Sequence, residues 1–349
     1  MTCDSHSTSA CPTGHLRTPR PLASTGLRLP ALGFGAAAIG NLYSAVEDEA
    51  AEEAVAEALR HGIRYFDTAP FYGYGLSERR LGRALARHPS EGVILSTKVG
   101  RLLEPVEPGS MSTDGFAVSG QRAVIDYSRS GVRRSFEASL QRLQRERVDI
   151  LLLHDVGATT HGDLHAQRLK QALDEALPAM AELKAMGACR AIGIGVNEAA
   201  VCMEIMPRFE LDCILLAGRY TLLEQASLTS VMAEAHRRHV GILIGGPFNS
   251  GLLANPTAPG STYDYARVDA ATLQRAQRIY DICAAEKVDV GAAALQFTLA
   301  HPAVVTVIAG MRSSAEVHSA AERLCARLPK SLWEALRRAG ILSPEAPTP

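Results

Sequence analysis

The stretch EDEAAEEAVAEALRHGIRYFDTA (47–69) contains one unit of the repeating pattern that decides the fold. In its first part, 47–62, alanine, valine and leucine recur at three- and four-residue spacing behind acidic residues, which predicts an amphipathic helix. Its second part, 63–69, is a short and mostly apolar run, which predicts a buried strand. The unit therefore indicates a helix followed directly by a strand of a parallel sheet.

The same alternation of amphipathic stretches and short apolar runs continues along the chain. Further helical patterns lie at 131–144, 173–187 and 227–241. Most strand candidates are rich in valine, isoleucine and leucine, as expected of strands buried on both faces. Eight such units predict a (β/α)8 barrel rather than an open doubly wound sheet, which usually has fewer strands in a chain of this length. The strand candidates are 30–37, 63–69, 92–100, 148–155, 189–196, 212–219, 241–247 and 304–310.

The barrel is predicted to occupy residues 21–342 as one domain. Segments 1–20 and 343–349 have no periodic apolar residues, so we expect both to be flexible. A short opening β-hairpin is expected within 20–30, where it would plug the barrel opposite the catalytic face. Two long segments, 101–130 and 252–270, follow the C-terminal ends of strands and are expected to form lids or substrate walls, with ordinary solvent loops as the alternative.

Composition favours a small-molecule partner. The 36 lysines and arginines nearly balance the 37 aspartates and glutamates, so there is no net charge to attract nucleic acid or an anionic membrane. Seven scattered cysteines without a C-x-x-C pair indicate a reducing compartment. No signal-like or membrane-spanning apolar segment is found, and we therefore expect a cytoplasmic monomer or small homo-oligomer.

Four ionisable residues follow or end successive strand candidates. Asp67 follows the second strand, Tyr72 lies five positions later, and Lys98 and His154 end the third and fourth strands. Taken singly, such a lysine is usually a solvated rim residue and such a histidine a core residue. Together they indicate a site, because the C-terminal ends of barrel strands converge on one mouth.

The residues around this group carry a family resemblance. FDTAPFYGYGLSERRLG (66–82) resembles the D-T-A-x-x-Y-G-x-G-x-S-E-x-x-L-G signature of the aldo-keto reductase superfamily. LSTKVG (95–100) and DILLLHD (149–155) resemble the segments that carry the family's lysine and histidine, and the similarity runs from about residue 22 to 340. The resemblance implies a nicotinamide-dependent oxidoreductase whose catalytic residues are Asp67, Tyr72, Lys98 and His154.

Other segments resemble one branch of the superfamily, the aldose 1-dehydrogenases. These segments include LGFGAAAIGNLY (32–43), GGPFNSGLLA (245–254) and AAALQFTLAHP (292–302). The branch includes D-threo-aldose and L-fucose dehydrogenases, with L-galactose dehydrogenases and pyridoxal 4-dehydrogenase as relatives. The resemblance implies oxidation of the C1 hemiacetal hydroxyl of an aldose to an aldonolactone. Pyridoxal oxidation and general aldehyde or ketone reduction are the nearby alternatives, and a non-catalytic cofactor-binding regulatory subunit is the outside one.

The four residue types suit proton transfer coupled to hydride transfer. A hydroxyl that becomes a carbonyl must lose a proton, and a phenol with a pKa of about 10 is a weak base at neutral pH. We expect the Lys98 ammonium to favour the phenolate of Tyr72, and Asp67 to keep that ammonium charged and oriented. His154 would orient the substrate oxygen. A Schiff-base aldolase with Lys98 as nucleophile is a further alternative.

The resemblance also implies where the cofactor binds. GVNE (195–198) stands where relatives hold the nicotinamide, GGPFNSGLL (245–253) resembles the pyrophosphate loop, and AGMRSSAEV (309–317) resembles the adenosine-ribose segment. Glu316 would repel a 2′-phosphate, which favours NAD, whereas Arg312 leaves NADP open. The predicted contacts are Gly35, Ala36, Asn197, Glu198, Gly246, Pro247, Asn249, Ser250, Gly251, Leu252, Gly310, Arg312, Ser313 and Glu316.

No metal site is predicted. His154, His161 and His165 lie close in sequence, but no H-x-H accompanies an early strand and no carboxylate partner is fixed.

Overall fold

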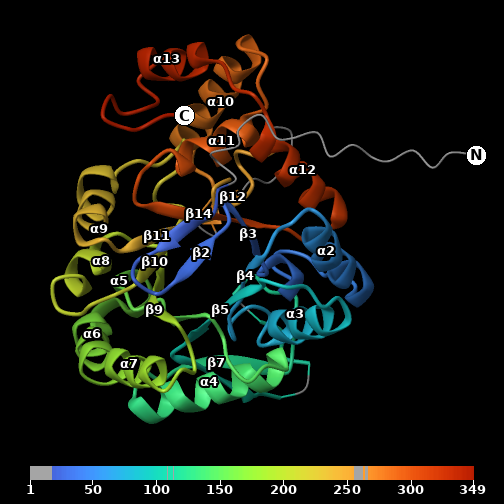
Figure 1. Cartoon of the computed structure of the whole chain (residues 1–349), viewed down its shortest axis with the longest axis vertical. Helices are drawn as coiled ribbons and strands as arrows, with labels where there is room; N and C mark the ends of the chain where they lie inside the picture. The colour runs from blue at the N-terminus through green and yellow to red at the C-terminus, as the bar shows by residue number, and fades with distance from the viewer. Residues whose placement is uncertain (1–17, 108, 113, 255–261, 264–265) are drawn as a thin grey trace, which may run out of the picture.

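Eight parallel strands close into a barrel at the centre of the molecule (Figure 1). The computed structural model describes residues 18–107, 109–112, 114–254, 262–263 and 266–349. Each barrel strand pairs with the next barrel strand along the chain, and the last pairs with the first. The (β/α)8 prediction is therefore confirmed. The strands are β3 (Leu32–Gly35), β4 (Tyr65–Asp67), β5 (Ile94–Val99), β8 (Ile150–His154), β9 (Ala191–Val196), β10 (Cys213–Ala217), β11 (Gly241–Gly245) and β14 (Val304–Gly310).

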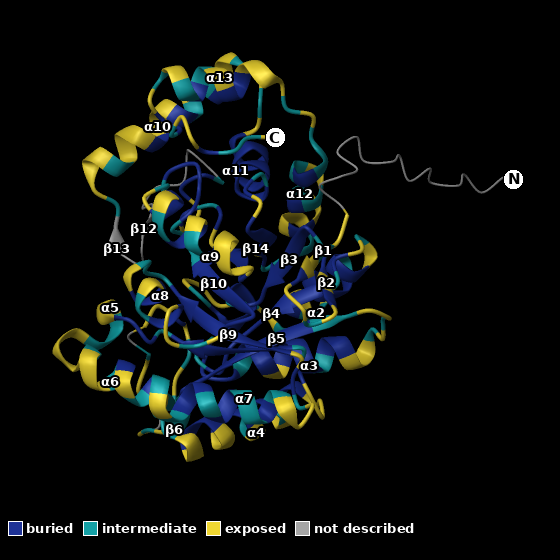
Figure 2. Ribbon diagram, turned by 60° about the vertical axis from the view of Figure 1, so that its left-hand side comes forward, coloured by how far each residue is buried: buried dark blue, intermediate teal, exposed yellow. Residues whose placement is uncertain are grey.

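Helices surround the barrel and present their apolar faces to it, while their exposed faces point outward (Figure 2). The predicted helix 47–62 is α2, and the predicted helix 131–144 is α4. The predicted helices 173–187 and 227–241 each begin with a π-helical turn, η3 and η4. The surrounding helices are α2 (Asp48–Arg60), α3 (Leu76–Arg87), α4 (Arg129–Leu143), α6 (His165–Gln171), η3 (Ala172–Ala176), α7 (Leu177–Ala185), α8 (Ala200–Ile205), η4 (Leu228–Met232), α9 (Ala233–Arg238), α11 (Val290–Leu299) and α12 (Ser314–Cys325).

Further strands and helices lie outside the eight-stranded barrel. Of the two long segments, 101–130 contains an antiparallel hairpin, β6 (Arg101–Pro105) and β7 (Gln121–Ile125). The described part of 252–270 includes β12 (Thr262–Tyr263) and β13 (Ala266–Arg267), while 255–261 and 264–265 lie outside the described residues. The remaining helices are η1 (Ala38–Gly40), α5 (Ala158–His161), η2 (Gly162–Leu164), α10 (Ala270–Ala285) and α13 (Lys330–Arg338). Within the described residues, no helix combines the length and apolar character needed to span a membrane.

The predicted domain limits stay predictions. Residues 1–17 of the expected flexible start lie outside the described residues. At the other end, segment 343–349 contacts α13: Ala346 is buried, and its carbonyl accepts a hydrogen bond of 2.9 Å from Arg337 Nη2. This tail therefore has partners that its polar sequence did not indicate.

The opening hairpin plugs the barrel at the end where its strands begin, as predicted. It consists of β1 (Arg20–Leu22) and β2 (Leu27–Leu29), joined by a turn in which Gly26 has a left-handed φ of 73°. Leu22, Leu27 and Leu29 are buried in one cluster with interior residues of the barrel strands, among them Tyr65. Because their side chains alternate inward along two short strands, they close this end to water.

Shortening one plug side chain is expected to destabilise the whole barrel. Leu29→Ala leaves a cavity among buried neighbours, so the free energy of unfolding should fall by about 2–5 kcal/mol in denaturant titrations. Arg28→Ala is the matched control in the same strand, because its side chain is exposed, and it should change stability by no more than about 0.5 kcal/mol. Equal effects of the two substitutions would contradict the packing role.

Candidate active site

A buried ion pair lies at the C-terminal mouth of the barrel. Lys98 Nζ is 2.8 Å from Asp67 Oδ2, and the two residues are 1% and 4% exposed. Lys98 also donates to the Thr68 carbonyl at 2.9 Å, and Ser96 Oγ donates to Asp67 Oδ1 at 2.7 Å. Both charged groups are thus hydrogen-bonded as well as paired, which offsets the cost of removing them from water.

The strand register places these side chains next to each other. Asp67 is the last residue of β4 and pairs with Ser96 of β5, so the two strands deliver their side chains to one level of the mouth. Ser96 in turn contacts the Tyr65 hydroxyl at 2.9 Å inside the barrel. Alternation along β5 puts Ser96 and Lys98 on the same face, a signal that could have identified Ser96 from the sequence.

Tyr72 is held in a tight loop between β4 and α3. Its N–H donates to the Ala69 carbonyl at 3.1 Å, and its own carbonyl accepts from the Ser77 N–H at 3.2 Å. The loop crosses η1 so closely that a Cβ on Gly73 would lie 2.2 Å from the Gly40 carbonyl oxygen. Only glycine fits at this crossing, which fixes the position of the loop that carries Tyr72.

The four residues predicted to be catalytic come together. Lys98 Nζ lies 4.6 Å from the centroid of the Tyr72 ring. The Tyr72 and His154 rings meet edge to face, with centroids 5.9 Å apart and an interplanar angle of 86°. Asp67 completes the group through its ion pair with Lys98. The cluster therefore combines a phenol, a cation with its counter-charge, and an imidazole.

Burial keeps the His154 imidazole neutral. It lowers the pKa of His154 well below the ordinary value, and the positive charges of Arg101 and Lys98 lower it further. Its Nδ1 is buried and has no hydrogen-bond partner among the described residues, while Nε2 lies 3.5 Å from Asp155 Oδ2. A neutral imidazole with an unused polar atom is suited to hydrogen-bond a substrate oxygen.

The phenol of Tyr72 is protonated at neutral pH. Burial raises its pKa well above the ordinary value, the charges of Asp67 and Asp155 raise it further, and Arg101 lowers it. The expected lowering of the Tyr72 pKa by Lys98 is not found, because the ammonium is already paired with Asp67. Tyr72 is therefore a proton donor first and becomes a base only when its proton is withdrawn.

Aromatic residues that the sequence did not reveal surround the phenol. The Phe116 ring centroid lies 6.1 Å from that of Tyr72, and the Phe71 and Phe116 rings meet edge to face at 5.5 Å. Arg101 lies over the Phe71 ring at 4.1 Å and pairs with Asp155 at 2.8 Å. Phe116 and Arg101 come from the long segment 101–130, whose loop sequence gives no signal that they reach the site.

Comparison with known proteins places this geometry in a family. Residues 31–341 match the model of the aldo/keto reductase family. The chain is 39% identical over 336 residues to pyridoxal 4-dehydrogenase of Microbacterium luteolum, covering 93% of this chain and 98% of that protein. It is also 39% identical over 334 residues to D-threo-aldose 1-dehydrogenase of a Pseudomonas species, covering 94% and 98%.

The chain belongs to the aldo/keto reductase family. A solved structure agrees: the holo form of an aldo-keto reductase from Bacillus halodurans is 26% identical, covers 94% of this chain and 97% of its own, and superposes with a TM-score of 0.73. The chain is therefore an oxidoreductase, and aldo-keto reductases use nicotinamide cofactors.

The predicted cofactor contacts follow the C-terminal ends of β3, β9, β11 and β14. Gly35 and Gly310 pair across the β3–β14 ladder, and the Ala36 N–H donates to the Asp67 carbonyl at 2.9 Å. Gly35 and Ala36 therefore adjoin Asp67 of the ion pair through their backbones. Their role as cofactor contacts remains a proposal.

The predicted pyrophosphate loop offers an unused polar atom. In the loop after β11, which includes Gly246, Pro247 and Leu252, three successive residues, Asn249, Ser250 and Gly251, have left-handed φ values. Asn249 is buried, and its Oδ1 has no hydrogen-bond partner among the described residues. Such an atom, beside a backbone that glycine allows to approach closely, fits a bound polar ligand.

The other predicted contacts already have protein partners. Glu198 accepts a hydrogen bond of 3.1 Å from the Thr159 N–H, so its carboxylate is tied to the start of α5. The Asn197 carbonyl accepts from Arg219 Nε. The Glu198 carboxylate is thus engaged by the protein, and Asn197 is held through its backbone carbonyl.

The start of α12 contains a carboxylate and a guanidinium close together. Ser313 caps this helix by accepting from the Glu316 N–H at 3.3 Å. Glu316 Oε2 accepts from the Arg312 N–H at 2.8 Å, and its Oε1 lies 3.6 Å from Arg312 Nε. Arg312 Nη1 donates to Ser44 Oγ at 2.6 Å. The Glu316 carboxylate and Arg312 therefore already contact each other.

Removing the counter-charge of Lys98 is expected to cost stability as well as activity. Asp67→Asn leaves the ammonium buried and unpaired, so the free energy of unfolding should fall by about 3–5 kcal/mol in denaturant titrations. The Asp67→Asn/Lys98→Met double variant removes both charges and should lose less than the single variant. Lys170→Ala, which breaks an exposed pair with Asp174, is the control and should cost at most about 1 kcal/mol. A double variant less stable than Asp67→Asn would contradict this reasoning.

Proposed function

We propose that this chain oxidises the C1 hemiacetal hydroxyl of an aldose, of the L-fucose or D-threo-aldose type, to an aldonolactone. The observation that carries the proposal is the Asp67, Tyr72, Lys98 and His154 cluster at the barrel mouth, in a chain 39% identical to a D-threo-aldose 1-dehydrogenase. The reaction uses a nicotinamide cofactor, which accepts the hydride when it is bound.

The side chains of the cluster divide the remaining work. His154, neutral and with an unused ring nitrogen, hydrogen-bonds the substrate oxygen and orients it toward Tyr72. After its own proton has left to solvent, the Tyr72 phenolate accepts the hydroxyl proton as the carbonyl forms, and Lys98 and Asp67 hold the charges around it in fixed positions. Because the pKa of Tyr72 is raised, the phenol that donates a proton in carbonyl reduction persists at neutral pH, and the phenolate needed for oxidation increases only as the pH becomes alkaline.

Pyridoxal is the second candidate substrate. The chain is equally identical, at 39%, to a pyridoxal 4-dehydrogenase. Phe71 and Phe116 give the site an aromatic wall beside Tyr72, and a flat pyridine ring can stack on such a wall.

The alternative of a Schiff-base aldolase with Lys98 as nucleophile is disfavoured, because Lys98 Nζ donates to both Asp67 and the Thr68 carbonyl.

NAD is the proposed cofactor, with NADP as the alternative. Glu316 puts a carboxylate beside Arg312 at the start of α12, where a 2′-phosphate would meet its negative charge. A ribose hydroxyl could instead donate to the same carboxylate.

Steady-state turnover on a substrate panel tests the proposal. L-Fucose, other aldoses and pyridoxal are each assayed with NAD and with NADP, and kcat/KM is compared. We expect the highest kcat/KM for an aldose with NAD. Preference for pyridoxal would establish the second candidate, whereas no turnover on any member of the panel would favour a non-catalytic role. Glu316→Gln should lower the ratio of kcat/KM with NAD to kcat/KM with NADP, because it removes the negative charge that repels the 2′-phosphate.

Removing one hydroxyl group tests the role of Tyr72. Tyr72→Phe should lower kcat by about a hundredfold or more while leaving cofactor affinity nearly unchanged, because only the proton-transfer group is lost. Tyr74→Phe is the matched control: the Tyr74 hydroxyl is bound by Asp114 and Ser112 in the neighbouring loop, so its loss should change kcat little. Retained turnover in Tyr72→Phe would exclude it as the acid–base residue.

A further inference from the structure

Two helices on the outside of the barrel bring a second group of ionisable side chains together. Helices α2 and α12 lie side by side (Figure 1), and each carries a histidine and a glutamate four residues apart. Glu57 lies in the last turn of α2 and His61 is the C-terminal cap of that helix, while His318 and Glu322 come from α12. Residues four apart lie on one helix face, so each pair acts as a unit.

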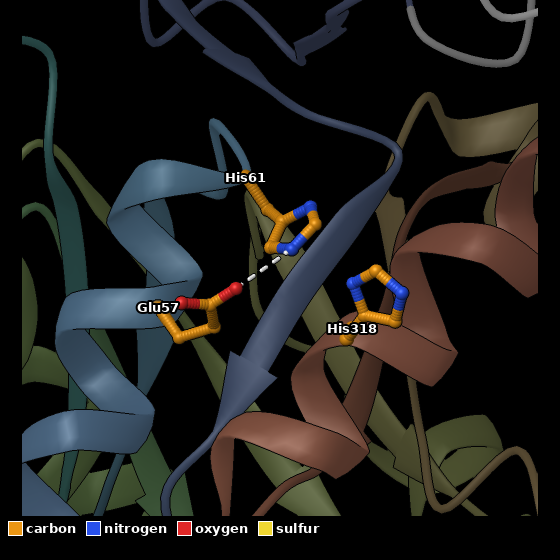
Figure 3. Close-up of side chains that lie close together, drawn as sticks. All are labelled: Glu57, His61 and His318. Carbon is orange, nitrogen blue, oxygen red and sulfur yellow. Dashed lines mark ion pairs between the residues drawn. The ribbon is translucent and has the colours of Figure 1, made fainter. Parts of the chain in front are cut away.

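Three of these side chains converge. The ligand-type atoms of Glu57, His61 and His318 all lie within 4.8 Å of one another. His61 Nε2 is 2.9 Å from Glu57 Oε1, and the two imidazole rings have centroids 5.3 Å apart. Figure 3 shows the glutamate and both rings turned toward one another across the gap between the helices.

Glu322 orients the second imidazole. His318 Nε2 lies 3.1 Å from Glu322 Oε1. In Figure 3 one ring nitrogen of His318 faces Glu57 and His61 while the other points away. The nitrogen that faces them is therefore Nδ1, and an Nε2–H directed at Glu322 leaves Nδ1 with a free lone pair. A carboxylate behind a histidine in this way is the usual support of a metal-bound imidazole.

We propose that Glu57, His61 and His318 bind a zinc-type divalent ion, with water completing the coordination. Imidazole nitrogen and carboxylate oxygen are ordinary zinc ligands, and bonds of about 2.0–2.1 Å require ligand atoms about 3.3 Å apart. The Glu57–His61 pair is already that close. The His318 side chain is 58% exposed, so a rotation about its side-chain bonds can bring Nδ1 the remaining distance.

The neighbouring positive charge, Arg60, contacts a different oxygen of Glu57 from the one that faces His61. Arg60 contacts Oε2 of Glu57 and also pairs with Glu53, so Oε1 is the oxygen directed at His61. Surface pairs account for Glu57 with His61 and for Glu322 with His318, but neither pair requires the two imidazoles to face each other. A bound cation accounts for all three side chains.

The ion would connect the first and last helices of the barrel. Helix α2 follows β3, helix α12 follows β14, and these two strands pair where the barrel closes. An ion held by both helices binds the folded chain more tightly than the unfolded one, so it stabilises the fold by mass action. The proposed site therefore acts on stability and lies apart from the residues proposed for catalysis.

Calorimetric titration with Zn²⁺ tests the site. Full-length protein without a histidine tag should bind about one ion per chain at this site. His61→Gln and His318→Gln should each weaken that binding at least about tenfold, because each removes one of three ligands. His88→Gln is the matched control. His88 lies 3.5 Å from Glu52 of α2, in a histidine–glutamate pair outside the three-residue cluster, so this variant should bind zinc as the unmodified chain does.

Three outcomes would overturn the proposal: unchanged binding in the His61→Gln/His318→Gln double variant, equal loss in His88→Gln, or equally tight binding of Mg²⁺, which prefers all-oxygen sites. Thermal unfolding gives an independent readout. Saturating Zn²⁺ should raise the Tm of the unmodified protein by a few degrees and leave the double variant unchanged. An equal rise in both proteins would also overturn the proposal.

Discussion

A buried ammonium group requires a counter-charge, and at the mouth of this barrel Asp67 supplies it to Lys98. Nearly complete burial of both groups makes the pair costly unless every polar atom is satisfied. Ser96 and the Thr68 carbonyl provide the additional hydrogen bonds, and the Tyr65 hydroxyl extends the network into the barrel interior. The barrel register that aligns β4 with β5 is therefore also the condition for the site.

The ion pair sets the electrostatic character of its neighbours. Because Lys98 is neutralised by Asp67, burial decides the state of the phenol, and the pKa of Tyr72 rises. Burial also lowers the pKa of His154, so its imidazole is neutral. The substrate oxygen would thus meet two uncharged hydrogen-bonding groups held beside a compensated charge pair. Because both groups are held in place before the substrate binds, little reorganisation is needed when a proton moves between Tyr72 and the substrate oxygen.

Local sequence predicted the architecture well because each barrel strand is a short apolar run buried on both faces. The run at 148–155 became β8, and the plug at 20–30 was recognised from its short alternating segments. The tail 343–349 was harder to judge, since a single buried alanine among polar residues leaves no periodic signal. Phe116 and Arg101 were missed for a similar reason, because a long loop has no fixed periodicity from which the direction of a side chain can be inferred.

The sequence by itself determined the barrel and the order of its strands, because apolar periodicity and strand ends are local properties, and its resemblance to the family signature selected the four residues that gather at the mouth. Only the tertiary structure decided the protonation of Tyr72, the aromatic wall beside it and the meeting of His61 with His318. Each of these depends on burial or on contact between segments distant in the chain. Such distances are set by how the helices and loops pack, which no local pattern encodes.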